Sequence, residues 1–389
     1  MIGRVPREKN ALDPQEAGQT VPSTAVPPPD AAGGRLVRRL KWLGWSVFWL
    51  LVLAALVWHE LHFSTFQAWW LMRHARSLTY NLHLGQAEGF AVPTHGPYNQ
   101  RLGYTELLLF SQRLIERGLV VTQQTAPEPA LRRHLERGLS NPFPERAHAG
   151  LTVYDCRREP VYAFRYPFRR YERFEDIPDA VVKSLLFIEN RDLLDEDRPR
   201  LNPAVDWVRF ARAAMGQLGS RLDIDLDTPG GSTLATQIEK YRHSPGGVTH
   251  DPREKLRQMV SAAVRAYRQG EHNLPVRRQI VLDYLNTVPL AAAPRHGEVH
   301  GLGDGLWVWF GTDFTDAWHA MLRARDPQPP GPGQAQILRQ VVALMVAHRR
   351  PAWYLFQGRD DLDQVTDAHL RLLRGAGIIS REWRDAALA

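Results

Sequence analysis

The chain has 389 residues, 44% of them hydrophobic, so it can bury a full core and form one large domain with appendages. Its 49 Lys and Arg against 42 Asp and Glu give a formal net charge of +7, which suits a membrane surface, lipid phosphates or nucleic acid. This composition excludes a disordered protein. The single cysteine, Cys156, excludes an internal disulfide framework and any multi-cysteine metal site, and we expect its thiol to be buried.

The chain begins with a segment typical of a tail, followed by a segment typical of a membrane anchor. Residues 1–39 are predicted to be a disordered cytoplasmic tail, because residues 20–34 are rich in proline and small residues without a hydrophobic period. Residues 40–60 are predicted to be a transmembrane helix, since the run WLGWSVFWLLVLAALVW is uncharged and long enough to cross a bilayer. Basic residues before it place the N-terminus in the cytoplasm. The alternatives are a cleaved signal peptide, for which we find no convincing cleavage site, and a buried soluble helix.

The next part of the chain predicts a small membrane-proximal domain. Residues 61–150 mix helical stretches, such as 104–117, with Pro and Gly breaks, and we interpret them as an α+β stalk of unknown role. The aromatic residues of 61–72 either lie at the membrane surface or extend the preceding helix. Residues 151–166 contain two β-rich runs around a polar turn and predict a hairpin. From Ile177 on, helical periods dominate.

One acidic residue ends a buried helical face. A helix is predicted to start near Pro178, which suits the first helical position, and its apolar stripe includes Leu185. Glu189 follows Leu185 by four residues and so lies on the same stripe. A carboxylate there either pairs with a cation, for which Arg191 is a candidate, or has its pKa raised toward the range of a general base. The residues alone favour the structural pairing.

A second group of residues precedes another predicted helix. The stretch GGSTLATQ, residues 230–237, has two glycines that let the backbone approach a ligand, and Ser232 or Thr233 can cap the helix. The free N–H groups of its first turn favour an anion. Thr233, Gln237 and Lys240 lie on one polar stripe that suits a phosphate, although an ordinary capped helix explains them equally well. A nucleotide-binding P-loop is disfavoured, because no Gly-Lys-Ser/Thr follows.

Taken in order, these segments resemble the motifs of the family 51 glycosyltransferases, the peptidoglycan polymerases found alone or as the first catalytic domain of bifunctional penicillin-binding proteins. The resemblance runs from about residue 171 to the C-terminus. The five similar segments are IPDAVVKSLLFIENR, GGSTLATQIEK, EKLRQMVSAAVRAY, RRQIVLDYLN and GLGDGLWVWFG. Nothing after them resembles a transpeptidase domain, so we expect a divergent member without one.

The resemblance implies a mainly α, lysozyme-like, two-lobed glycosyltransferase domain over residues 151–389, behind the transmembrane helix and the small α+β stalk. In this family a glutamate deprotonates the acceptor hydroxyl, which attacks the donor sugar with inversion and expels polyprenyl pyrophosphate. Glu189 matches that base. The residues that the resemblance assigns to substrate binding are Arg191, Ser232, Thr233, Gln237, Lys240, Lys255 and Asn286.

The chain departs from the family pattern where catalysis depends on it. Asn190 replaces the aspartate that follows the base. Gln258 aligns with the second family glutamate, and an amide neither carries a negative charge nor relays a proton. Glu254 lies one helical turn before Gln258 on the same face, so it is the candidate substitute.

Two functions stay open. The first is a peptidoglycan glycosyltransferase of the bacterial inner membrane, single-pass with its catalytic domain outside the cytoplasm, which polymerises a lipid II type disaccharide. The second is a catalytically degenerate member that binds lipid-linked precursor or glycan and scaffolds other cell-wall synthesis proteins. No nucleic acid partner is expected, since topology explains the basic cluster before Trp42. No cofactor is required, although family members often use Mg²⁺ or Mn²⁺, which leaves open a divalent cation at the acidic run 195–197.

Overall fold

The computed structural model describes residues 31–86, 106–146, 149–207 and 232–389, with side chains from residue 40 onward. Most of the predicted tail, Tyr104, Gly230 and Gly231 lie outside the described residues. The chain divides into two compact units, Met1–Leu56 and Val57–Ala389. The described part is mainly helical with small two-stranded sheets, which confirms the predicted mainly α fold class. The predicted domain limits at residues 39, 60 and 150 stay predictions.

The helix α1 (Ala31–Phe63) contains the apolar segment predicted from the sequence. Its part Leu40–Phe63 has 24 residues and a mean hydropathy of 1.9, and its apolar window is not buried within the protein. Within the described residues it is the one helix long and apolar enough to cross a membrane. Its length and composition suit a single membrane anchor or a signal sequence.

A new helix, α2 (Thr65–Arg76), follows directly, because Ser64 adopts a left-handed conformation with φ of 53°. The Glu60 carboxylate accepts hydrogen bonds of 2.8 Å from the backbone N–H groups of Phe66 and Gln67. These bonds satisfy two of the open donors in the first turn of α2. Residues 61–63 of the aromatic segment therefore still belong to α1, and residues 65–72 form a separate helix.

The predicted α+β stalk contains two helices besides α2 and one small sheet in its described part. The helices are α4 (Leu107–Glu116) and α5 (Pro129–Glu136), and the strands β1 (Tyr80–Leu84) and β2 (Gln123–Pro127) pair antiparallel. The stalk shares a core with the helices that follow it. Ala68, Leu71 and Leu131 pack in one cluster with Ala262 and Tyr267, which belong to the helix α9 (Pro252–Ala266) and its C-terminal cap.

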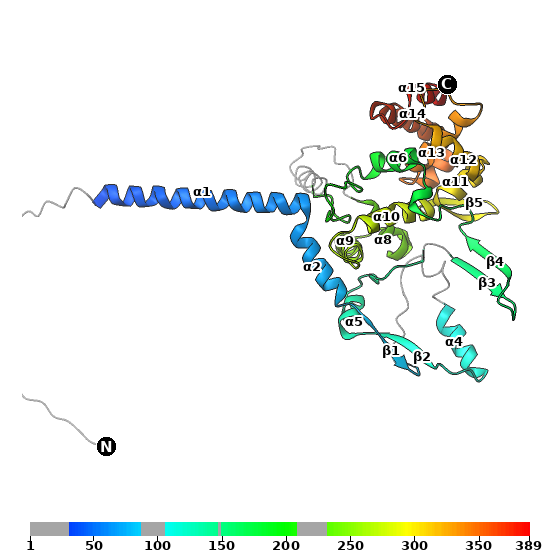
Figure 1. Cartoon of the computed structure of the whole chain (residues 1–389), viewed down its shortest axis with the longest axis horizontal. Coiled ribbons are helices and arrows are strands. Elements are labelled where there is room, and N and C mark those ends of the chain that lie inside the picture. The colour runs from blue at the N-terminus through cyan, green and yellow to red at the C-terminus, as the bar shows by residue number, and fades with distance from the viewer. Residues whose placement is uncertain (1–30, 87–105, 147–148, 208–231) are drawn as a thin grey trace, which may run out of the picture. The chain divides into compact units, whose positions relative to one another are not determined.

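The predicted hairpin is present as β3 (Ala149–Tyr154) and β4 (Pro160–Tyr166), which pair antiparallel (Figure 1). Cys156 lies in its turn and is exposed, so the expectation of a buried thiol was wrong. The turn is held by Asp155, whose side chain accepts from the backbone N–H groups of Arg157 and Glu159 at 2.8 and 2.9 Å. Because the Asp155 side chain satisfies backbone donors of the turn, the turn does not depend on burying the Cys156 side chain.

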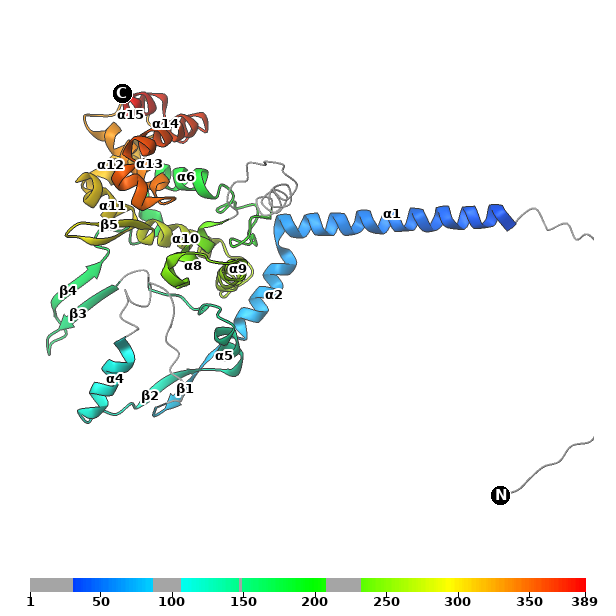
Figure 2. The same ribbon diagram turned by 180° about the vertical axis from the view of Figure 1, so that it is seen from behind.

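The remaining helices, apart from α9, contribute to the main core, and α13 lies at its centre; the buried apolar residues of α9 belong to the cluster shared with the stalk. The remaining helices are α6 (Asp179–Glu189), α8 (Leu234–His243), α9 (Pro252–Ala266), α10 (Leu274–Thr287), α11 (Gly301–Phe310), α12 (Phe314–Arg323), α13 (Gln334–Ala347), α14 (Arg359–Gly375) and α15 (Arg381–Leu388). Short helical turns occur at Phe174–Asp176, Pro245–Gly247 and Trp353–Gln357. α13 packs against α6, α11, α12, α14 and α15, and α6 and α13 lie side by side in both views (Figures 1 and 2).

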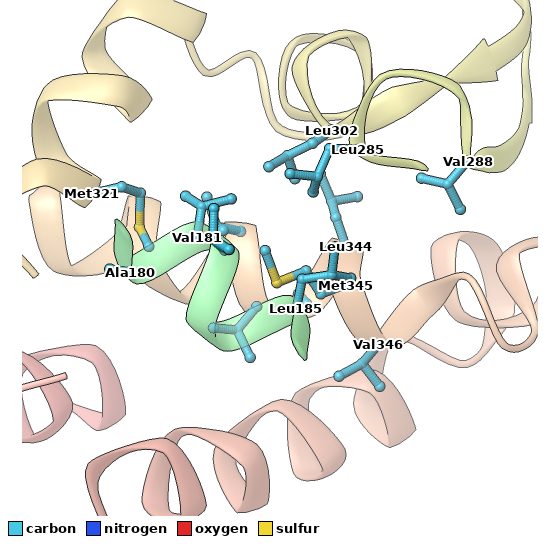
Figure 3. Close-up of a cluster of buried hydrophobic side chains, with 14 of the residues drawn as sticks. Ala180, Val181, Leu185, Leu285, Val288, Leu302, Met321, Leu344, Met345 and Val346 are labelled. Carbon is cyan, nitrogen blue, oxygen red and sulfur yellow. The ribbon is translucent and has the colours of Figure 1, made fainter. Parts of the chain in front are cut away.

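One face of α6 is fixed by this core. Val181 and Leu185 lie among Leu302, Leu344 and Met345 in the buried cluster (Figure 3). Burying such a side chain stabilises the fold by roughly 1.5–3 kcal/mol, so the rotation of α6 about its axis is strongly specified. That rotation determines where the last residue of the helix points.

A hairpin, β5 (Pro289–Ala293) with β6 (Gly297–His300), interrupts the helical region that was expected to run on from Ile177. It lies directly between α10 and α11 in the chain. The alanine-rich run of β5 lacks the β-branched alternation by which a strand is usually recognised, so its pattern does not predict a strand. It carries the Glu298 and His300 side chains, which contact each other at 3.1 Å.

Candidate active site

Glu189 is the last residue of α6 and ends its buried face. The helix stops because Asn190 leaves the helical conformation, with φ of −159°. Glu189 is 8% exposed, as its place on the apolar stripe predicts. A carboxylate in such a place needs partners, since burying an unpaired charge is strongly unfavourable.

Gln237 of α8 is one of these partners. Its Nε2 donates to Glu189 Oε2 at 2.9 Å, and the hydroxyl of Tyr284, from α10, donates to Gln237 Oε1 at 3.2 Å. Burial raises the pKa of Tyr284 well above its ordinary value, so this hydroxyl stays protonated and acts as a donor. A donor at Oε1 fixes the Gln237 amide with its NH₂ group toward Glu189. The stripe residue Gln237 therefore orients the predicted base.

Two residues directly after α13 face the other carboxylate oxygen. His348 Nε2 and Arg349 Nη2 each lie 3.5 Å from Glu189 Oε1. The sequence named Arg191 as the candidate cation, but the arginine that the structure pairs with Glu189 is Arg349. The guanidinium of Arg191 instead lies over the ring of Phe187, 4.0 Å from its centroid. His348 and Arg349 were absent from the predicted site because only the packing of α13 on α6 brings them there.

The hydroxyls of Ser232 and Thr233, at the start of α8, have different partners. Thr233 is the cap: its hydroxyl accepts from the N–H of Thr236 at 3.3 Å, and the Thr236 hydroxyl accepts from the N–H of Thr233 at 2.9 Å. Thr233 is 3% exposed, so this reciprocal cap uses its side chain internally. Ser232 is half-buried and accepts a hydrogen bond of 2.7 Å from Lys255 Nζ. Of the two predicted hydroxyls, the one that contacts a cation is therefore that of Ser232.

Positive charge gathers around this helix. Burial, and secondly the charge of Lys240, lowers the pKa of Lys255 to about 8. Burial also lowers the pKa of His348, partly offset by the Glu189 carboxylate, and Lys240 adds to the lowering. The charge of Lys240 thus acts on both Lys255 and His348. Burial and a second cation disfavour the charged form of such a lysine, and an anion bound beside it would stabilise that form.

The helix α9 places Glu254 and Gln258 on one buried face, as predicted. Gln258 Nε2 donates to the hydroxyls of Ser244 and Thr249 at 2.8 and 2.9 Å. Glu254 Oε2 accepts from the N–H of His250 at 3.0 Å, and its Oε1 is buried without a hydrogen-bond partner among the described residues. Both side chains line a pocket of about 230 Å³, and Glu189 is not among its lining residues. Glu254, the candidate substitute, and Gln258 therefore line a pocket to which Glu189 does not contribute.

Asn286 uses its whole side chain inside the fold. Its Nδ2 donates to Tyr171 O at 2.8 Å, and its Oδ1 accepts from Tyr171 N at 3.0 Å. Gly301, with φ of 75°, packs against the carbonyl of Asn286 so closely that a Cβ would overlap it. Asn286 braces α10 against the segment before α6. Its contacts give no support to a role in substrate binding.

A cavity of about 390 Å³ opens beside the residue that follows Glu189. It lies wholly within the unit Val57–Ala389. Its lining combines the end of α1, including Trp58 and Leu61, with Asn190, Leu193 and Thr233. A lining that contains both apolar side chains and polar groups suits an amphiphilic ligand.

Two carboxylates of the acidic run 195–197 pair with arginines in the described part of the chain. Asp195 accepts from Arg198 at 2.7 Å, and Glu196 lies 3.3 Å from Arg278. In the described parts of the chain, no three His, Cys, Asp or Glu side chains lie together in a way that could hold a metal ion. These carboxylates do not fit a divalent cation.

One known family matches the part of the chain that carries these residues. A family model described as Transglycosylase matches residues 158–356. The match covers slightly more than half of the chain and includes Glu189, the described part of the α8 segment, and the end of α13. No curated protein matches the chain. The chain therefore belongs to the transglycosylase family, whose members are peptidoglycan glycosyltransferases.

Proposed function

We propose that the protein is a membrane-anchored peptidoglycan glycosyltransferase that polymerises a lipid-linked disaccharide with inversion and releases polyprenyl pyrophosphate. The helix α1 anchors it in the bacterial inner membrane, with the N-terminus in the cytoplasm and the catalytic domain outside. Its substrate is a lipid II type precursor.

The observation that carries this proposal is the hydrogen bond between Glu189 and Gln237. It ties the end of α6 to α8, the helix that carries Lys240 and that begins beside the Ser232–Lys255 pair. One short region thus holds a buried carboxylate and several cations. Inverting glycosyl transfer with a pyrophosphate leaving group requires both kinds of group.

The roles follow from the chemistry of each group. Glu189 takes the proton from the acceptor hydroxyl as its oxygen attacks the anomeric carbon of the donor. Lys240, Lys255 and Ser232 bind the pyrophosphate, where negative charge grows as the glycosidic bond breaks. Lys255 suits this task because burial makes its charge dependent on a nearby anion. The cavity beside Asn190 holds the part of the lipid-linked substrate nearest to the membrane helix.

Gln258 supports a second candidate function, in which the protein binds lipid-linked precursor or glycan and recruits other cell-wall synthesis proteins without polymerising. The Gln258 amide donates to two hydroxyls, and Glu254, its neighbour on the helix, lines the same pocket, to which Glu189 does not contribute. A protein that lost its second carboxylate and kept its anion-binding helix binds the precursor without turning it over.

One assay separates the two functions. The full chain in detergent or nanodiscs receives lipid-linked disaccharide pentapeptide, and polymer length and precursor binding are measured for wild type and Glu189→Gln. A glycosyltransferase forms polymer, and loss of its base lowers the rate by about 100- to 10,000-fold while binding persists. Glu172→Gln is the matched control, because that carboxylate is exposed and pairs with Arg170.

The outcomes are distinct. If wild type and Glu189→Gln bind the precursor equally and neither forms polymer, the binding function holds and the enzymatic one is overturned. A gain of polymerisation in Gln258→Glu shows that the missing carboxylate limits the rate.

A further inference from the structure

His348 presents a defined nitrogen to the predicted base. Its Nδ1 lies 2.7 Å from the carbonyl oxygen of Met345. A carbonyl oxygen only accepts, so Nδ1 carries a hydrogen, and in the neutral ring Nε2 is the unprotonated nitrogen. This Nε2 lies 3.5 Å from Glu189 Oε1, and the His348 side chain is 10% exposed.

Two acceptor atoms that face each other in a nearly buried site repel unless a proton lies between them. Charged and titratable groups approach His348 from each element packed around it: Glu189 from α6, Lys240 from α8, Tyr284 from α10, and Arg349 from its own segment. Tyr284 stays neutral, and the two cations oppose a charge on the imidazole. Burial lowers the pKa of His348, and the carboxylate of Glu189 and the carbonyl of Met345 oppose this lowering, so they are the groups that favour a proton on the ring.

We propose that His348 is a positioning residue that shares with Glu189 the one proton taken from the acceptor, and that it relays this proton away from Glu189 during turnover. This inference rests on the proposed glycosyltransferase function and assigns a role to a residue outside the family motifs described above.

The proposed step moves one proton and exchanges one bond at the anomeric carbon. The acceptor O–H bond breaks and its proton goes to Glu189, while the acceptor oxygen forms a bond to the anomeric carbon and the bond from that carbon to the pyrophosphate oxygen breaks with its electron pair. The proton then passes from Glu189 Oε1 to His348 Nε2, which restores the carboxylate. The imidazolium is held by Met345 O at Nδ1 until Nε2 releases the proton to water. Arg349 at 3.5 Å favours the restored carboxylate.

The first arm of the test is the pH–rate profile of polymerisation for wild type and His348→Gln. A pair that shares a proton titrates with an apparent value belonging to both groups, so removal of the imidazole shifts the acid limb to lower pH by about one unit or more. The plateau rate falls about tenfold or more, because Glu189 must release its proton unaided. His369→Gln is the matched control, since His369 Nδ1 also lies 2.7 Å from a carbonyl, that of Val365, on α14.

The second arm keeps His348 intact. Its titration is followed by NMR of histidine-labelled full-length protein in wild type and Glu189→Gln, with the signal assigned by its absence in His348→Gln. Loss of the carboxylate lowers the pKa of His348, and the remaining histidines keep theirs.

Different results would overturn the role of His348 and the glycosyltransferase function. An active wild type with an unmoved acid limb in His348→Gln, or a His348 titration that is unchanged in Glu189→Gln, overturns the role of His348 and leaves the glycosyltransferase intact. A wild type that binds precursor but forms no polymer overturns the enzymatic function itself, and with it the relay.

Discussion

Lys255 gives the sharpest prediction about the anion site, because its charge depends on pH in the accessible range. With a pKa of about 8, roughly nine-tenths of the molecules carry the charge at pH 7 and about one-tenth at pH 9. The pyrophosphate of a lipid-linked disaccharide is a diester and stays ionised over this interval. If it binds the charged form of Lys255, its affinity falls about tenfold between pH 7 and pH 9, and bound substrate raises the pKa of Lys255.

Binding is measured in the Glu189→Gln background, which prevents turnover, by titration with the lipid-linked disaccharide at pH 7, 8 and 9. Lys255→Met lowers the affinity at pH 7 by about 10- to 100-fold, the range for a lost hydrogen bond to a charged group, and removes the pH response. Lys183→Met is the control, since Lys183 is an exposed lysine that pairs with Asp179 within α6. An affinity that is flat from pH 7 to 9 in the parent, or an equal slope in Lys255→Met, refutes the assignment.

Three further changes test contacts inside the fold, the first of them at the site. Tyr284→Phe frees the Gln237 amide and lowers stability by about 1 kcal/mol together with a several-fold slower polymerisation, as checked by urea unfolding and the polymer assay. Asp304→Asn removes one charged acceptor that is fully buried and binds the backbone N–H of Arg169 at 3.0 Å, so unfolding in urea shows a loss of about 1.5–3 kcal/mol. Gly303→Ala places a Cβ against the carbonyl of Arg169, and the same measurement shows about 1–3 kcal/mol of destabilisation; an unchanged midpoint contradicts the close approach.

The parts of the site that could be predicted from the sequence are those fixed by local geometry. Glu189 lies on a stripe defined by residues of its own helix, and the capping of α8 by Thr233 involves a partner three residues away. The hairpin around Cys156 followed from its β-rich runs, although the exposure of the thiol did not. In each case the periodicity of one element carried the information.

The parts that could not be predicted depend on contacts between elements. His348 and Arg349 follow an apolar helix with no polar period, and only the burial of that helix beside α6 brings them to Glu189. Tyr284 is a buried residue of α10, and its hydroxyl orients the Gln237 amide only because α8 packs against α10. Asn286 matched a motif position, yet its amide is used on the backbone of Tyr171.

The shared packing of α2, α5 and α9 limits how this protein can be shortened. A fragment starting at the first predicted catalytic residue would bare an alanine-rich surface that Ala68, Leu71 and Leu131 normally cover. Such a surface favours self-association in water. Crystallisation or enzymology without the apolar part of α1 should therefore retain the chain from Val57 onward, which also keeps Glu60 at the start of α2.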